Sequence, residues 1–308
     1  MELRQLRYFV KIADMGSMSR ASKALHISQP SLSHQMAQLE DELGKPLLTR
    51  IPSGVLMTAE GEAFYRQALQ ILRQIDDIRG VVDSAQLGGH VSISLVQTQA
   101  VQYALPLMVK VHELYPRIEL EVFDDASSDA LQGIASGRRD FGMLVNEEDA
   151  VLLETRPVVE EQLFLMSHPA HAPQGDVITL AEVVRLPLAL PGPGQIPRAL
   201  HDALDGGLGA LAKERWIVAN SIAIFRQAVL AGVAHAIQPW GVMRDEVATG
   251  RVRATPIGPG LVRKVHLSAC RGTTMSQSAQ AVRQVLLAVI AQEIASGHVR
   301  GRLLASDD

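Results

Sequence analysis

Residues 1–58 place apolar side chains at helical spacing in three consecutive segments. The apolar positions are Leu3, Leu6, Phe9, Val10 and Ala13 in the first segment, Ala21, Ala24 and Leu25 in the second, and Leu32, Met36, Leu39 and Leu43 in the third. We expect Gly16 to end the first helix, Ser19 to cap the second and Ser28 to cap the third. Residues 45–57 then read as two short strands around a turn. The pattern predicts helix, tight turn, helix and wing, with the first helix packed beneath them.

A single long helix with a different apolar period is predicted after Thr58. Glu60 and Glu62 in its first turn favour the positive end of the helix dipole. The apolar positions then alternate in steps of four and three, and this period of about 3.5 residues is typical of a coiled-coil seam. We expect this helix to pair two copies of the chain through Phe64, Ala68, Ile71, Ile75, Ile78 and Val82. A helix packed only on its own domain is the alternative.

From Val91 onward strand-like and helix-like segments alternate, which predicts parallel sheets flanked by helices. A first unit has expected strands at 91–96, 117–123 and 141–145 and helices at 101–114 and 128–136. After residues 160–167, a second alternating unit has expected strands at 188–191, 216–219 and 234–238 and helices at 196–204 and 222–230. A further strand is expected at 265–270, before a last helix at 276–296. The alternation itself predicts two α/β units.

The start of the helix expected from Ser28 to about Leu43 carries uncharged polar side chains. A helix with such a start can enter the major groove of DNA, where Gln pairs with adenine and Ser or His with several base edges. Pro30 is tolerated there because a first-turn amide has no intrahelical partner. At the tip of the wing, Arg and Ser suit phosphate or minor-groove contacts. We expect DNA contacts from Gln29, Pro30, Ser31, Ser33, His34, Arg50 and Ser53. The alternative is a polar surface on an ordinary helical hairpin.

Composition and charge agree with this division. The 308 residues are 47% hydrophobic and 20% charged, as in globular proteins, so we expect two or three cores. No apolar run is long enough for a bilayer and the start lacks the apolar core of a secretion signal, which predicts a cytoplasmic protein without membrane contact. The formal net charge is -4, whereas residues 1–58 hold seven Lys or Arg against five acidic residues, a net of +2. Cys270, the single cysteine, is expected to be a small buried hydrophobe.

The first sixty residues carry motifs that resemble LysR-type transcriptional regulators, with the nitrogen assimilation control proteins as the nearest subgroup. These motifs are Ala21-Ser22-Lys23-Ala24-Leu25, Ser28-Gln29-Pro30-Ser31-Leu32-Ser33, Gln38-Leu39-Glu40, Leu43-Gly44, Pro46-Leu47-Leu48-Thr49-Arg50 and Leu56, Thr58, Glu60 and Gly61. His34 departs from the family, which commonly has Arg there. The resemblance implies a winged helix-turn-helix (1–58), a linker helix (59–88) and a two-lobed periplasmic-binding-protein-like effector domain (89–308). The resemblance places about 89–160 and 266–308 in lobe 1 and about 161–265 in lobe 2. It also implies that the chain crosses between the lobes near 160–167 and returns to lobe 1 with the strand at 265–270.

The resemblance also implies promoter DNA, further copies of the chain in a homodimer or homotetramer, a small-molecule effector and RNA polymerase as partners, and no cofactor. In open parallel sheets, ligands bind beyond the carboxyl ends of the strands. Those ends supply the expected effector-binding residues, namely Gln97, Thr98, Gln99, Ser128, Gly194, Gln195 and Asn220. Each of them can equally serve as a helix cap or turn former. Asp124 and Asp125 lie at the same edge and would disfavour an anionic ligand unless they point away. His235 would either enter the cleft or simply pack.

Motifs for catalysis are missing from the sequence. There is no G-x-S-x-G, P-loop or H-E-x-x-H sequence, and the glycines at 206–209 have no strand before them. His168 and His171 lie among prolines without a carboxylate in register, so we do not expect a metal site. We therefore expect a DNA-binding regulator and no enzyme. The alternative function is a solute-binding-protein-like receptor with a helical N-terminus that does not bind DNA, which would leave the polar helix start at 28–33 unexplained.

Overall fold

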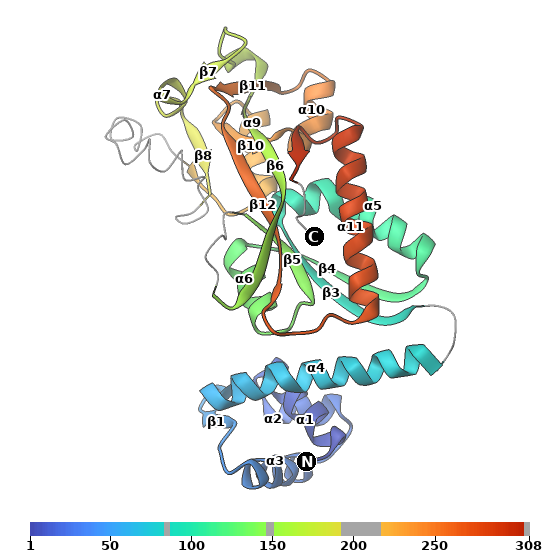
Figure 1. Ribbon diagram of the computed structural model, residues 1–308. Coiled ribbons are helices and arrows are strands. Elements are labelled where there is room, and N and C mark those ends of the chain that lie inside the picture. The colour runs from blue at the N-terminus through green and yellow to red at the C-terminus, as the bar shows by residue number, and fades with distance from the viewer. Residues whose placement is uncertain (83–86, 146–150, 192–216, 305–308) are drawn as a thin grey trace.

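The computed structural model describes residues 1–82, 87–145, 151–191 and 217–304, with the side chains at 73, 74 and 76–82 left out. Its N-terminal part consists of α1 (Leu3–Met15), α2 (Met18–Ala24), α3 (Gln29–Leu43), the hairpin β1 (Leu48–Ile51) and β2 (Gly54–Met57), and the long helix α4 (Ala59–Val82). The predicted winged helix-turn-helix followed by a long helix is therefore confirmed (Figure 1).

Local capping chemistry sets the ends of these helices. Gly16 ends α1 in the left-handed conformation at φ 58°, as predicted. Ser28 Oγ accepts a hydrogen bond from the Ser31 amide at the start of α3, also as predicted. The prediction for Ser19 was wrong, because α2 begins earlier and Ser17 Oγ caps it by accepting from the Arg20 amide.

The first positions of the predicted coiled-coil seam on α4 belong to the chain's own core. Ala68 is 1% exposed, and the Phe64 ring lies edge-on to Phe9 with centroids 5.1 Å apart. This corrects the prediction for Ala68, since a fully buried side chain cannot contact a second copy. Phe64 packs on α1 and stays only partly exposed. Ile71 is 36% exposed and Ile75 is partly exposed, so both stay available. The side chains of Ile78 and Val82 lie outside the described residues.

Two α/β lobes follow the long helix. Lobe 1 contains β3 (Gly88–Val96), α5 (Gln97–Leu114), β4 (Arg117–Asp125), α6 (Ser127–Ala135), β5 (Phe141–Val145), α11 (Gln277–Ala295) and β13 (Gly301–Leu303). Lobe 2 contains β7 (Ile178–Thr179), α7 (Leu180–Val183), β8 (Leu188–Leu190), β9 (Ile217–Val218), α9 (Ile222–Leu230), β10 (His235–Pro239), α10 (Arg244–Ala248) and β11 (Arg253–Gly258). Short 3₁₀ turns cover Pro169–His171 and Trp240–Met243. The helix expected at 196–204 lies outside the described residues.

Two long strands, β6 (Leu153–Ser167) and β12 (Val262–Cys270), run between the lobes. The strand order is β4-β3-β5-β12-β6-β10-β8-β9. As predicted, β3 pairs in parallel with β4 and β5, and β8 in parallel with β9 and β10. The expectation of purely parallel sheets was wrong for β12, which is antiparallel to both β5 and β6 because it returns from lobe 2.

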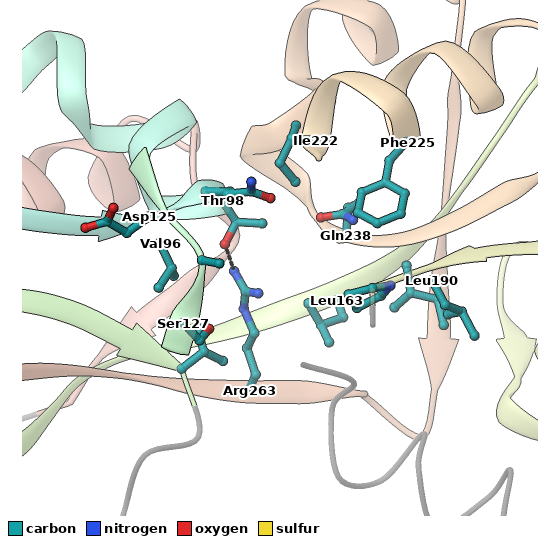
Figure 2. A pocket seen from close by; sticks show the side chains of 15 residues that line it. Val96, Thr98, Asp125, Ser127, Leu163, Leu190, Ile222, Phe225, Gln238 and Arg263 are labelled. Atoms are coloured by element: carbon teal, nitrogen blue, oxygen red, sulfur yellow. Dashed lines mark hydrogen bonds between the residues drawn. The ribbon is translucent and has the colours of Figure 1, made fainter. Parts of the chain in front are cut away.

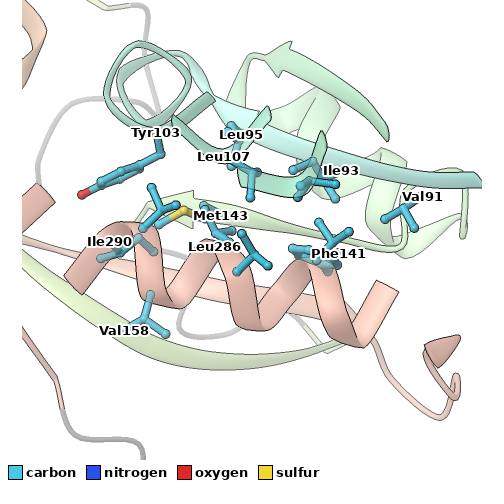
Figure 3. Close-up of a cluster of buried hydrophobic side chains, with 14 of the residues drawn as sticks. Val91, Ile93, Leu95, Tyr103, Leu107, Phe141, Met143, Val158, Leu286 and Ile290 are labelled. Atoms are coloured by element: carbon cyan, nitrogen blue, oxygen red, sulfur yellow. The ribbon is translucent and has the colours of Figure 1, made fainter. Parts of the chain in front are cut away.

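The largest core lies where α5 and α11 cover one face of the lobe 1 sheet. Figure 3 shows Tyr103 and Leu107 of α5 and Leu286 and Ile290 of α11 meeting side chains of the strands, including Phe141. The helix expected to start at residue 101 starts at Gln97 and continues through Pro106. Consequently the first turn of α5 lies directly beyond the end of β3, which positions it for a site at that edge.

Candidate DNA-binding surface and interlobe cavity

The amino end of α3 presents its polar side chains to solvent. Leu32, Met36 and Leu39 are buried against the helices beneath, which orients the opposite face outward. Exposed residues on that outer side are Gln29, Pro30, Ser31 and His34, and Ser33 is partly exposed. The sequence-predicted contact residues of α3 therefore lie together on one accessible surface.

The wing is held against this surface by side chains of α3. Arg50 Nη2 donates a hydrogen bond to Ser33 Oγ at 2.8 Å, although the two residues are 17 positions apart. Ser53, at the turn between β1 and β2, is exposed and has no such contact with α3 among the described residues. Of the two predicted wing residues, Arg50 thus joins the α3 surface, whereas Ser53 stays at the wing tip.

Glu40 has a structural role that the sequence did not indicate. Its Oε1 atom accepts hydrogen bonds from the amides of Leu47 and Leu48 at 2.7 and 3.0 Å, which fastens the first strand of the wing to α3. Thr58 Oγ1 also donates to the Pro46 carbonyl oxygen at 2.8 Å. Both contacts join residues from separate elements, so helical periodicity carries no signal for them. The Glu40 bonds fix the wing relative to α3, and the Thr58 bond ties the chain before the wing to the start of α4.

A cavity of about 90 Å³ lies between the lobes, at the carboxyl ends of the strands (Figure 2). Its lining comes from both lobes and from β12: Val96, Gln97, Thr98, Asp125, Ala126, Ser127, Val145, Leu163, Leu190, Pro191, Ile222, Phe225, Ile237, Gln238 and Arg263. Gln97 Nε2 donates to the Asn220 carbonyl oxygen at 2.8 Å, so a hydrogen bond joins lobe 1 to lobe 2 beside the cavity.

The expected effector-binding residues are placed unevenly around this cavity. Gln97 and Thr98 line it, and Asn220 contributes its carbonyl oxygen to the bond across it. Gln99 is fully buried behind the wall, so its prediction as a contact is corrected. Ser128 is exposed and the preceding residue, Ser127, lines the cavity instead. Ser127 is the first residue of α6, and successive residues of a helix point in different directions, so Ser128 faces away from the cavity. Gly194 and Gln195 lie outside the described residues.

A charged pair that sequence reasoning missed forms the floor of the cavity. Arg263 Nε and Nη2 donate to Glu161 Oε2 at 2.9 and 2.7 Å, and Nη2 also donates to Thr98 Oγ1 at 2.7 Å. Glu161 is fully buried, with its Oε1 accepting from Gln102 Nε2 at 3.0 Å. Burial raises the pKa of the neighbouring Tyr103, and the negative charge of Glu161 adds to the shift. Because the pair joins β6 to β12, only the folded chain brings it together.

The carboxylate of Asp125 is used within lobe 1. Its Oδ2 accepts from Ser94 Oγ at 2.6 Å and lies 3.7 Å from Arg139 Nε. Arg139 in turn lies over the ring of Phe123, 3.3 Å from its centroid. Burial, followed by the charge of Asp125, raises the pKa of Asp124. The objection to an anionic ligand is therefore weaker than the sequence indicated, since the Asp125 carboxylate is already paired and Asp124 is exposed and does not line the cavity.

His235 packs at the start of β10 and does not line the cavity. The ring is buried, and Nδ1 lies 2.7 Å from Ser167 Oγ. Burial lowers the pKa of His235, and the proximity of His171 lowers it further. Within the described ranges, no group of three or more His, Cys, Asp or Glu side chains is arranged to hold a metal ion. None of the described helices is both long and apolar enough to cross a bilayer.

Comparisons with known proteins agree with both halves of the chain. The model of the bacterial regulatory helix-turn-helix protein, lysR family, matches residues 3–62, and that of the LysR substrate binding domain matches residues 84–291. The nitrogen assimilation regulatory protein nac of Klebsiella aerogenes is 29% identical over 297 residues, which are 95% of this chain and 96% of that protein.

Solved structures share the fold over nearly the whole length. A full-length OxyR variant from Pseudomonas aeruginosa superposes with a TM-score of 0.72 at 24% identity and covers 94% of each chain. Full-length CbnR, solved in complex with its target DNA, gives a TM-score of 0.58 at 24% identity and covers 95% of this chain and 99% of that one. At these identities the likeness supports the fold alone.

Proposed function

Because the chain belongs to the LysR family of DNA-binding transcriptional regulators, we propose that it reads DNA through the amino end of α3 and anchors itself through the wing. Gln29, Ser31, Ser33 and His34 would contact base edges, with Pro30 at the same helix start. Arg50 and Ser53 would contact phosphates or the minor groove.

The observation that carries this proposal is the hydrogen bond of 2.8 Å between Arg50 and Ser33. It brings a cation of the wing next to the polar start of α3, so one continuous surface offers both base-reading and phosphate-binding groups. Leu32 and Leu39 hold the opposite side of α3 in the core, which supports a fixed outward orientation of that surface. A rigid presentation favours specific recognition because less side-chain freedom is lost on binding.

We further propose that two copies pair through the exposed part of α4. Ile71 and Ile75 are described seam positions that the chain's own core leaves at least partly exposed, as is Phe64 at the start of the seam. Ile78 and Val82 continue the same spacing. A dimer would present two α3 helices to half-sites about one turn of DNA apart. Family members bind small-molecule effectors and form oligomers, so the two-lobed part would sense an effector in the cavity or mediate contacts in a homotetramer. The boundaries 1–58, 59–88 and 89–308 and contact with RNA polymerase belong to the same proposal.

Sequencing the DNA retained by the purified protein tests the proposal. One enriched motif should emerge, and Gln29→Ala should cost roughly 1 to 3 kcal/mol of binding free energy on that motif while leaving scrambled duplexes unaffected. Gln38→Ala, an exposed glutamine farther along α3, is the matched control. Equal losses for Gln29→Ala on both duplexes would remove its assigned role. Failure to retain any DNA would favour the solute-receptor alternative.

A further inference from the structure

Three helices begin at the interlobe cavity without a side-chain cap. The residues at their N-cap positions are Val96 for α5, Ala126 for α6 and Ser221 for α9, and none of them makes a side-chain hydrogen bond to the first turn. Elsewhere in the chain, Ser28 caps α3 and Ser276 caps α11 through their hydroxyl groups. The first amides of a helix have no partner within the helix. At this cavity they are therefore left for another acceptor.

A buried glutamine gives an independent indication of a ligand. Gln238 is only 5% exposed and lines the cavity from β10, between Ile222 and Phe225 of α9 (Figure 2). Its side-chain amide makes no hydrogen bond to any residue that the structure describes. The amide therefore opens into the cavity, and most polar groups at such a depth are satisfied by protein, water or a ligand. A polar atom of a bound molecule would satisfy it here.

Arg263 supplies the third group of donors. Its side chain is 10% exposed, and the Nε and Nη2 donors are used by Glu161 and Thr98. Its two Nη1 hydrogens have no acceptor within the described parts of the chain. A guanidinium held from behind by a carboxylate has a fixed orientation, and its planar fork suits an oxyanion in two-point contact. Glu161 thus orients Arg263 and leaves one edge of the guanidinium for a ligand.

The charges around the cavity distinguish between classes of ligand. Glu161 neutralises Arg263, and Asp125 is engaged by Ser94 and Arg139, so the side-chain pairs balance. What remains is the partial positive charge at three helix starts, each worth about half an elementary charge. A ligand with one negative charge is therefore favoured. A second carboxylate on the ligand would find no further cation. An ammonium group on the ligand would face amide N–H donors, and both neighbouring carboxylates are already paired.

Apart from Gln238, the lining from lobe 2 is apolar. Leu163, Leu190 and Phe225 line the cavity on that side (Figure 2), as does Ile237. A volume of about 90 Å³ holds roughly six to nine non-hydrogen atoms, if each needs the 10 to 15 Å³ that a water molecule needs. The ligand would accordingly combine one oxyanion with a short apolar body.

We propose that the cavity binds a small organic monocarboxylate without an ammonium group, and that Arg263 and Gln238 determine this specificity. The carboxylate would accept from Arg263 Nη1 and from the amides at the starts of α5 and α6, with the Gln238 amide donating to the same group. The apolar body would lie against Leu163 and Phe225. This inference rests on the proposed function only in treating the cavity as the effector site.

A matched series of five-carbon compounds tests the ligand class by calorimetry or ligand-observed NMR on the full chain. Pentanoate should bind roughly tenfold or more tightly than pentanamide, its neutral counterpart, because hydrogen bonds to a charged group are the stronger ones. Norvaline adds an ammonium group and glutarate adds a second carboxylate, and both should bind more weakly than pentanoate. Gln238→Leu should weaken pentanoate binding severalfold, since the leucine keeps the volume but loses the donor.

The charged pair needs a variant that can still fold. Arg263→Gln alone would leave the buried Glu161 carboxylate without its cation. The double variant with Glu161→Gln is therefore used, and its folding is checked by circular dichroism. It should bind pentanoate and pentanamide equally. Lys264→Gln, an exposed neighbour on β12, should keep the preference for pentanoate.

Two results would overturn the inference. One is that pentanamide, norvaline or glutarate binds as tightly as pentanoate. The other is that monocarboxylates from acetate to benzoate give no binding signal at 20 mM. Retention of a DNA motif is measured separately without any ligand, so a failure of the ligand class stays distinguishable from a failure of DNA binding.

Discussion

Replacing Ser33 and Arg50 singly and together measures what the hydrogen bond between α3 and the wing contributes to DNA binding. The bond is 2.8 Å long and joins exposed groups. A hydrogen bond contributes about 1 kcal/mol net, and solvent exposure keeps a charged donor near that value. If Ser33 holds Arg50 in place, the two single variants should together lose more DNA-binding free energy than the double variant loses. The difference should be about 1 kcal/mol, or roughly fivefold in Kd.

The assay is fluorescence anisotropy on the selected and a scrambled duplex at several salt concentrations. Arg50→Ala should weaken both duplexes alike and reduce the slope of log K against log salt by about one unit, as expected for one lost phosphate contact. Ser33→Ala should weaken binding to both duplexes by part of the Arg50→Ala effect, and it should also relax the sequence preference at one position of the DNA site. Lys45→Ala, an exposed cation outside the bond, is the charge control and should not couple to Ser33.

Additive losses, within about 0.3 kcal/mol, would refute the reasoning, because two residues that act through one bond cannot contribute independently. In that case Ser33 would read a base without help from the wing. An unchanged salt slope for Arg50→Ala would instead show that the guanidinium meets no phosphate in the complex.

Three further variants test other parts of the structure. Glu40→Ala should lower the free energy of unfolding by about 1 to 3 kcal/mol, since two wing amides lose their acceptor, and urea denaturation measures this; a change below 0.5 kcal/mol would contradict the role. Ile75→Asp should dissociate the dimer, whereas Gln67→Asp on the same helix should not, and light scattering with an unchanged mass for Ile75→Asp would count against the seam. Because burial and His171 lower the pKa of His235, the folded state favours the neutral ring; unfolding free energy should therefore fall as the pH drops below about 6.5. His235→Asn should flatten this dependence, and an identical pH profile would speak against it.

Local patterns were sufficient for the elements and for the DNA-facing surface. The start of α3 is recognisable because Ser28 supplies a cap, Pro30 suits a first turn, and the spacing of Leu32, Met36 and Leu39 decides which face is buried. The alternation from residue 91 likewise identified strands flanked by helices, and the resemblance to the LysR family implied their division into two lobes. In each case the determining interactions act within one or two helical turns or one strand.

The same local reasoning misassigned side chains wherever a distant element decided their surroundings. Ala68 matches a coiled-coil period, yet the chain's own core buries it completely, and Phe64 packs in part on Phe9 of α1. The sequence does not say whether an apolar stripe packs within its own chain or against a second copy. Ser128 and Ser127 are equally plausible at the end of a strand. Only the direction in which α6 leaves the sheet puts Ser127 in the cavity.

The sequence by itself determined which segments form helices and strands, which end of α3 is polar, and that the chain has a DNA-binding part followed by a two-lobed part. Tertiary structure alone decided the ion pairs of Arg263 with Glu161 and of Asp125 with Arg139, and the hydrogen bond between Arg50 and Ser33. It also decided that the Gln238 side chain lines the cavity. Secondary structure follows from interactions between near neighbours in the chain. A charge's partner depends on which strands cross, and β6 and β12 bring together residues about a hundred positions apart.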